Sequence, residues 1–213
     1  MATTKRMYSE RRRCMRSSFS NFLPLIAVII LVAVSISSGC SSQDEANNAT
    51  LGEINSIEKL ADNRLIAMDF TTQDEIFYSQ LQASEDQYKE ALDMLYGLGP
   101  TFYLEGYGYE ARVKSLQFKI DFLDVCSELA AADEDAEAIF QTSTPEFRAG
   151  LVEALNDYQN IRQRILFLQV MGGDIDKNLI GSDYIKAISI IRGELDVMLE
   201  SVDSRISFLA KYR

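Results

Sequence analysis

Hydrophobic residues recur every three or four positions along four long segments of the chain, with polar residues between them. This spacing gathers the repeated side chains on one face of a helix, so each segment is predicted to be an amphipathic helix. The repeated positions are Phe77, Leu81, Ser84, Tyr88, Ala91 and Leu95; Tyr109, Val113, Leu116, Ile120 and Leu123; Phe147, Leu151, Ala154, Tyr158, Ile161, Ile165 and Leu168; and Tyr184, Ile188, Ile191, Leu195, Met198, Val202, Ile206 and Leu209.

Residues that favour helix ends lie at the boundaries of these segments. Thr72 and Glu75 form a candidate capping box ahead of the first, and Thr144 with Pro145 opens the third. Ser182 is the expected cap of the fourth. Glycines follow the first and third segments, where they are expected to end the helices.

No segment alternates with period two, and the chain has only three prolines, so a sheet is not expected. Four helices with one apolar face each bury those faces most economically as an all-α, antiparallel four-helix bundle over residues 71–213. The alternative is an extended helical hairpin that completes its bundle by dimerising. That alternative predicts a homo-oligomer.

The first 39 residues have a different pattern. Residues 1–22 contain six basic residues and one acidic residue, and an uncharged, mainly apolar run follows over residues 23–39. Its apolar part, about 15 to 18 residues long, is at the short limit for a spanning helix and is typical of a signal sequence. Because a basic flank stays cytoplasmic, we expect attachment to the cell membrane with the body on the extracytoplasmic side.

Ser37-Ser38-Gly39-Cys40 closes this run and resembles the lipobox of prokaryotic lipoproteins. The resemblance implies cleavage before Cys40 and lipidation of that residue, although Ser37 stands where the pattern usually has Leu. Two alternatives remain: an uncleaved single-span anchor, and a subunit whose stretch PLIAVIILVAVSI resembles the assembly helix of archaeal pilin-type proteins.

Residues 40–70 are predicted to be a polar tether followed by a short helix. The stretch CSSQDEANNATLGE has the composition of a flexible tether. The following residues Ile54, Ile57, Leu60, Ala61 and Met68 have helical spacing. Cys126 is the one cysteine after Cys40, so this part of the chain cannot form an internal disulfide.

Charge narrows the range of partners. From residue 41 onward the chain has 15 basic and 31 acidic residues, a net charge of −16, and no basic cluster. Such a body repels phosphate backbones, so we expect no nucleic-acid binding. Protein partners remain, together with the membrane at the N-terminus.

The chain has no histidine and no tryptophan. This excludes His-ligated metal sites, haem attachment through a C-x-x-C-H motif and every Ser-His or Cys-His nucleophile pair. We also expect no two carboxylates at i, i+3 or i+4 spacing on a core face. The sequence therefore predicts neither an enzyme nor a bound cofactor.

Two acidic stretches are candidates for cation sites. Asp174, Asp176 and Asn178 have the 1-3-5 spacing of an EF-hand loop, but Leu179 and Ile185 replace the glycine and glutamate which that loop requires. We therefore interpret the stretch as a polar connection between helices. ADEDAEA, residues 132–138, is interpreted as a solvated acidic helix end or loop.

An unusual mixture of aromatic residues and glycines separates the first two segments. It offers a candidate contact surface, because tyrosine combines rigid contact area with a polar tip; a lid over the end of the bundle is the alternative. Its aromatic residues are Tyr96, Phe102, Tyr103, Tyr107 and Tyr109. Tyr88, Tyr158 and Tyr184 instead fall on the apolar faces, where their hydroxyl groups need partners.

These observations favour a membrane-anchored, extracytoplasmic helical-bundle lipoprotein that acts as a binding, accessory or scaffold component of a cell-envelope assembly. A ligand-sensing four-helix domain that works through a partner, in the layout of chemoreceptor periplasmic domains, is the second hypothesis. A pilin-like filament subunit is the third.

Overall fold

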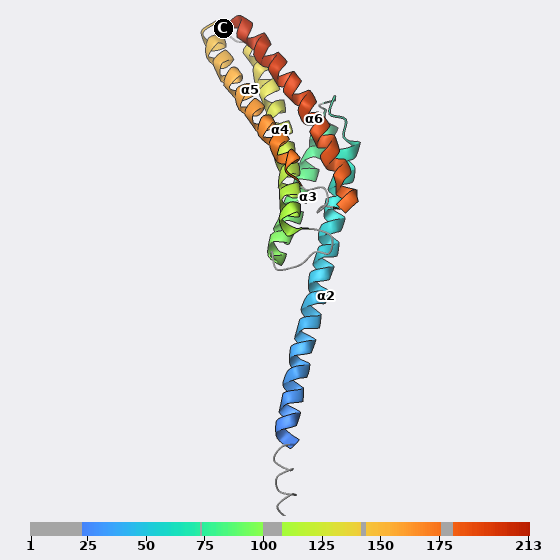
Figure 1. Cartoon of the computed structure of the whole chain (residues 1–213). Helices are drawn as coiled ribbons and strands as arrows, with labels where there is room; N and C mark the ends of the chain where they lie inside the picture. The colour runs from blue at the N-terminus through green and yellow to red at the C-terminus, as the bar shows by residue number, and fades with distance from the viewer. Residues whose placement is uncertain (1–22, 73, 100–107, 142–143, 176–180) are drawn as a thin grey trace, which may run out of the picture. The chain divides into compact units, whose positions relative to one another are not determined.

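The structure is a computed structural model that describes residues 23–72, 74–99, 108–141, 144–175 and 181–213, with side chains from residue 44 onward except those of 144–145 and 181–183. The described chain contains helices and no strand, so the predicted all-α class is confirmed (Figure 1). Its elements are α2 (Leu23–Ala67), α3 (Glu75–Leu98), α4 (Tyr109–Ile139), α5 (Thr144–Gly173), α6 (Gly181–Leu209) and the 3₁₀ turn η1 (Ala210–Tyr212).

The chain divides into two compact units, Met1–Ala49 and Thr50–Arg213. The second unit contains the end of α2 together with α3 to α6. Those last four helices correspond to the four segments that the sequence predicts. The end of α2 adds a fifth helix, because Ile54, Ala61 and Leu65 are completely buried in the core.

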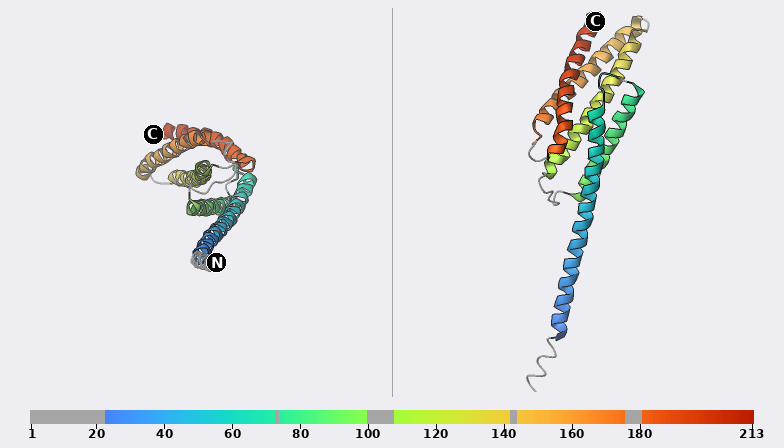
Figure 2. Two further views of the ribbon diagram at one scale, coloured as in Figure 1. Left: turned by 60° about the horizontal axis from the view of Figure 1, so that its bottom comes forward. Right: turned by 90° about the vertical axis from the view of Figure 1, so that its right-hand side faces the viewer.

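Successive helices of this unit run antiparallel (Figure 2). Arg162 of α5 pairs with Asp203 of α6, and Gln169 of α5 with Asp196, so the residue numbers of the two helices run in opposite directions. The predicted core positions Leu116, Ile161 and Leu195 are all buried. The three- and four-residue spacing therefore predicted these buried positions correctly.

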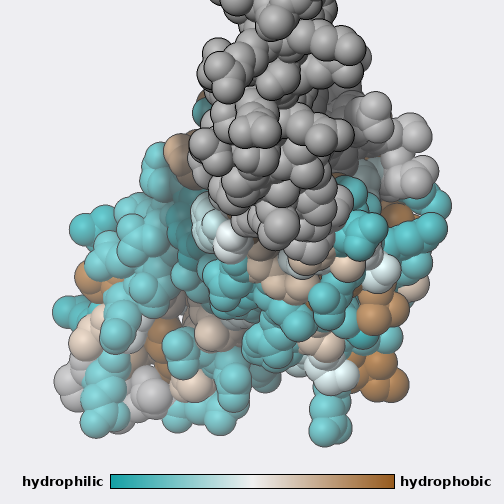
Figure 3. Space-filling model, turned by 90° about the horizontal axis from the view of Figure 1, so that it is seen from below, coloured by the Kyte–Doolittle hydropathy of each residue, from teal (hydrophilic) through white to brown (hydrophobic). Residues whose placement is uncertain are grey.

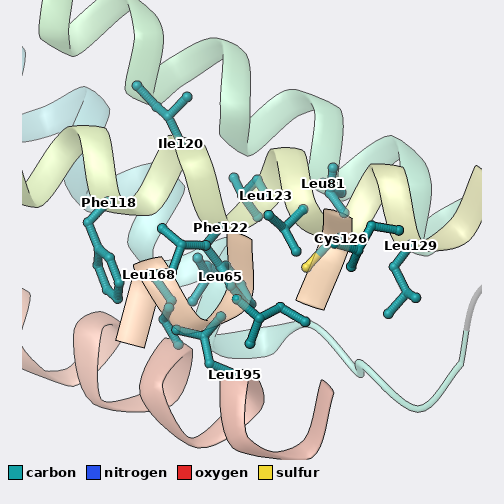
Figure 4. Packing of buried hydrophobic residues seen from close by; sticks show 14 of the residues in the cluster. Leu65, Leu81, Phe118, Ile120, Phe122, Leu123, Cys126, Leu129, Leu168 and Leu195 are labelled. Carbon is teal, nitrogen blue, oxygen red and sulfur yellow. The ribbon is translucent and has the colours of Figure 1, made fainter. Parts of the chain in front are cut away.

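Helix α4 departs from the predicted single apolar face. Phe118, Phe122 and Val125 are fully buried although they lie beside the predicted positions. Several residues of this helix pack among side chains of the neighbouring helices (Figure 4). A helix that is enclosed on several sides has only a narrow solvated face, so its pattern underestimates its burial.

The helix ends correct one prediction and decide between two alternatives in another. The cap of α3 is Asp74 rather than Thr72: its Oδ1 accepts a hydrogen bond from the backbone N–H of Phe77 at 2.8 Å. The acidic stretch, predicted as a helix end or a loop, is the end of α4, which continues to Ile139. The connection after α3 begins at Gly99, whose φ of 75° is the left-handed conformation that glycine tolerates.

The predicted polar tether is helical in the structure, because α2 continues without a break from Leu23 to Ala67. Extending an existing helix adds one hydrogen bond per residue without a new nucleation cost, and residues 41–67 contain no proline. Leu60, which the pattern placed on the inner face, is exposed. Within the described residues, no helix combines the length and the apolar character of a membrane span.

Candidate functional site

Four charged side chains meet in the interior of the second unit. We call Glu58 and Asp62 of α2 with Arg112 and Lys119 of α4 the buried ion network; their side chains are at most 5% exposed. The ammonium of Lys119 lies 2.9 Å from Glu58 Oε1 and 2.7 Å from Asp62 Oδ1. Arg112 donates to Glu58 Oε2 from Nη2 at 2.9 Å and from Nε at 3.2 Å.

Polar groups from three helices surround this network. The hydroxyl of Tyr88, on α3, donates to Asp62 Oδ1 at 2.6 Å. Asn55 Oδ1, on α2, accepts from Arg112 Nη2 at 2.7 Å. The Lys119 ammonium also lies 5.1 Å from the ring centroid of Tyr88 and 5.4 Å from that of Tyr184, which is on α6. Both rings can therefore stabilise the cation.

Burial and pairing act in opposite directions on these groups. Burial raises the pKa of Asp62, and the Lys119 charge only partly offsets that rise. Burial alone would lower the pKa of Lys119, but the charges of Glu58 and Asp62 outweigh it and the pKa is raised. Burial also raises the pKa of Tyr88 well above its usual range. Lys119 and Tyr88 therefore keep their protons at neutral pH.

The network contains two acids and two bases, so its formal charge is zero. Each member is bonded to at least one other member, as buried charges require. Removing Lys119 would leave Asp62 without its cation, and removing Glu58 would leave Arg112 without its carboxylate, so the arrangement fastens α2 to α4 in one register. The expectation that no two carboxylates share a core face at i, i+4 was wrong, because Glu58 and Asp62 do.

A second polar cluster joins α4, α5 and α6. The Arg205 guanidinium binds both carboxylate oxygens of Asp133, with Nε–Oδ1 and Nη2–Oδ2 distances of 2.5 Å. Tyr158 donates to Asp133 Oδ1 at 2.6 Å. Asp133 belongs to the ADEDAEA stretch, whose other acids Glu134, Asp135 and Glu137 are exposed. One residue of that stretch is thus a structural partner and three face solvent.

Aromatic rings gather where α4 ends, α5 begins and α6 ends. We call Phe140, Phe147, Phe208 and Tyr212 the aromatic end patch; its adjacent rings have centroids 5.2 to 5.9 Å apart. Phe140, Phe208 and Tyr212 are 45%, 47% and 50% exposed. A hollow of about 340 Å³ adjoins the patch and is lined by Ala136, Glu137, Phe140, Tyr158, Ser204, Arg205, Phe208 and Leu209.

The residues predicted as a contact surface are only partly described. Tyr96 is exposed near the end of α3, and Tyr109 is half-buried at the start of α4. Phe102, Tyr103 and Tyr107 lie outside the described residues. Figure 3 shows hydrophilic residues with separate hydrophobic ones among them on the face seen from below.

Only one of the three residues that are weak candidates for a cation site is described. Asp174 is exposed just after α5, whereas Asp176 and Asn178 lie outside the described part of the chain. Among the described residues, no three acidic or cysteine side chains are grouped closely enough to hold a metal ion. Cys126 is buried as a free thiol, and burial raises its pKa. Side chains before residue 44 are outside the description, so lipidation of Cys40 stays a prediction.

Sequence reasoning missed both the buried ion network and the aromatic end patch. The network had a readable signal: Glu58 and Asp62 extend the Ile54 and Leu65 face of α2 at helical spacing, and Arg112 and Lys119 are one heptad apart on α4. The patch had none, because it joins residues from three separate segments. Comparisons with family models, curated proteins and solved structures find no match to this chain.

Proposed function

We propose that this chain is a membrane-anchored, extracytoplasmic helical-bundle lipoprotein that binds another protein, as an accessory or scaffold component of a cell-envelope assembly. The basic flank, the apolar run and Cys40 support the anchoring and its direction. The bundle of four long helices, completed by the end of α2, supports a rigid platform for binding.

The aromatic end patch is the observation that carries the binding proposal. Large aromatic side chains are enriched at protein interfaces, where they supply much of the binding energy. Three rings of the patch are about half exposed although they contact one another. Their exposed area and the adjoining hollow of about 340 Å³ together offer an anchoring point for a partner side chain.

The patch also has a suitable place within the second unit. The chain enters this unit at Thr50, and the patch lies at the opposite end, where α4 and α6 finish (Figures 1 and 2). A partner that binds the patch would therefore approach the second unit at the ends of α4 and α6.

Photo-cross-linking of the full chain in native membranes tests the proposal. A photoreactive phenylalanine analogue replaces Phe208, and the control carries it at Phe167, a phenylalanine on α5 that is at least as exposed. We expect a discrete adduct with one protein from position 208 that position 167 does not give. The same adducts from both positions, or none from position 208, would contradict the proposal.

The anchoring is tested separately by the intact mass of the membrane-extracted protein. Lipidation predicts a mature chain that begins at Cys40 and carries the mass of acyl groups. An unmodified chain that retains residues 1–39 would instead favour the uncleaved anchor, without affecting the binding proposal.

A further inference from the structure

Helix α2 fills one half of a groove between α4 and α6. Near its start in the second unit, Asn55 accepts hydrogen bonds from Arg112 of α4 and, at 3.5 Å, from Tyr184 of α6. Glu58 and Asp62 then bind α4 further along. The end of α2 thus lies in the groove as a helix whose acidic face meets two buried cations.

The chain leaves this groove at Phe70. Its ring packs on Phe122 of α4 and on Phe77 of α3, with centroid distances of 5.6 and 5.8 Å, and α3 then runs back. Helices α4 and α6 continue side by side past that point, since Asp133 binds Arg205. From Leu129 to Phe140 the groove extends for about 17 Å, or three helical turns.

Two hollows lie along this continuation. The first, of about 90 Å³, is lined by residues that include Phe77, Cys126 and Val197. The second is the hollow of about 340 Å³ beside Phe140 and Phe208, and Arg205 lines both. Val197 is 61% exposed, so apolar area along the groove faces solvent. The groove therefore has two anchoring points two to three helical turns apart.

The charges along this part of the groove are mainly negative. Arg205 lines it, but Asp133 already pairs with that guanidinium. Glu194 lines the first hollow and Glu137 the second. Burial and the charge of Asp69 raise the pKa of Glu194.

We infer that the open half of the α4–α6 groove, from Leu129 to Phe140, binds an amphipathic helix of a protein partner. That helix has bulky apolar side chains two to three turns apart, with lysine or arginine beside them. The inference rests on the proposed function, because it names the surface and the partner chemistry of that binding. Helix α2 shows that this groove accepts a helix, and the carboxylates of Glu194 and Glu137 favour basic flanks.

Defined probes test the groove on the full chain in nanodiscs of zwitterionic lipid. One peptide has leucine and lysine at amphipathic helical spacing, a second replaces lysine by glutamate, and a third scrambles the first. A photoreactive residue in place of Met198, which lines the first hollow, reports contact with each peptide. We expect an adduct with the first peptide only; equal adducts with all three would overturn the inference.

Blocking variants provide the control. Val197→Arg and Ser204→Arg place a long cation in the first and second hollows, and both residues are exposed, so the fold should tolerate them. Each should weaken binding of the lysine peptide about ten-fold or more, as loss of an interface anchor does. Val170→Arg, at an equally exposed valine on α5, should leave binding unchanged.

The outcomes separate this inference from the proposed function. Equal binding of the lysine peptide by Val197→Arg and by the unmodified chain would overturn the groove inference, even if Phe208 still cross-links to a membrane protein. An adduct at twice the mass of the chain without peptide would also overturn it, in favour of a second copy as occupant. Peptide binding that only the groove variants lose would support it, even if no partner is captured at Phe208.

Discussion

Glu58 and Asp62, one helical turn apart on α2, bind the same ammonium group of Lys119. A single buried cation thus holds two carboxylates of another helix, and Arg112 balances the remaining charge. An apolar helix face could shift by one turn with little loss of free energy, whereas a buried charge that loses its partner is strongly destabilising. We therefore attribute the register of α2 to this network.

Lys119→Met should destabilise the second unit severely. Methionine keeps the length of the side chain, but Arg112 is then the one cation of the network left for the two buried carboxylates. We expect a cost of about 3 to 5 kcal/mol. Urea unfolding of the full chain in mild detergent, followed by circular dichroism, measures the loss. Lys114→Met, at an exposed position of α4, is the control and should change stability little. A loss below about 1 kcal/mol for Lys119→Met would mean that the network does not hold α2.

Stability should fall as the pH rises above about 9. Burial raises the pKa of Cys126 and Tyr88 above their ordinary 9.0 and 10.0, and the paired carboxylates raise that of Lys119 above 10.5. The folded chain therefore keeps protons that the unfolded chain loses. These groups contribute their full share to the free energy of unfolding below their ordinary pKa values, and progressively less above them. Unfolding midpoints measured between about pH 8 and about pH 11 give the decline of stability with pH. Tyr88→Phe should make the decline above about pH 10 shallower, and an unchanged slope would contradict the assignment.

The inner faces of α3, α5 and α6 could be predicted because each helix has one buried side and one solvated side. Residues such as Leu81, Ile165 and Ile191 then follow a single rhythm, and all three are buried. Helix α4 could not be predicted this way, because its neighbours bury Phe118 and Lys119 as well as Leu116.

The site was harder to predict because its members come from different helices. Glu58 and Asp62 share a helix face with Ile54 and Leu65, but charged residues are usually solvated, so this spacing alone does not predict that they are buried. The basic residues that compensate them lie more than fifty positions away. Only the packing of α2 against α4 reveals the pairing.

Asp74→Ala should cost about 1 kcal/mol, because it removes the side-chain oxygen that binds the Phe77 N–H at the start of α3. Thr72→Ala tests the capping box that the sequence indicated. The Thr72 hydroxyl donates to the Asp69 carbonyl at 3.4 Å, before the start of α3, so this change should have little effect. Urea unfolding of both variants compares the two caps, and a larger loss for Thr72→Ala would restore the original prediction.

Alanine at two helical glycines should have opposite effects. At Gly172 the added Cβ would lie 2.8 Å from Cζ and 2.9 Å from Cε2 of Phe118. That ring is completely buried, so it cannot move aside, and we expect a loss of about 1 to 3 kcal/mol from overpacking.

At Gly193, within α6, nothing lies within 4 Å of the added atom. Gly193→Ala should therefore gain about 0.5 to 1 kcal/mol from the lower entropy of the unfolded chain. Thermal unfolding of the two variants of the full chain gives the comparison. A gain at both positions would show that Phe118 can yield, and hence that the seam between α4 and α5 is less tightly packed than the distances indicate.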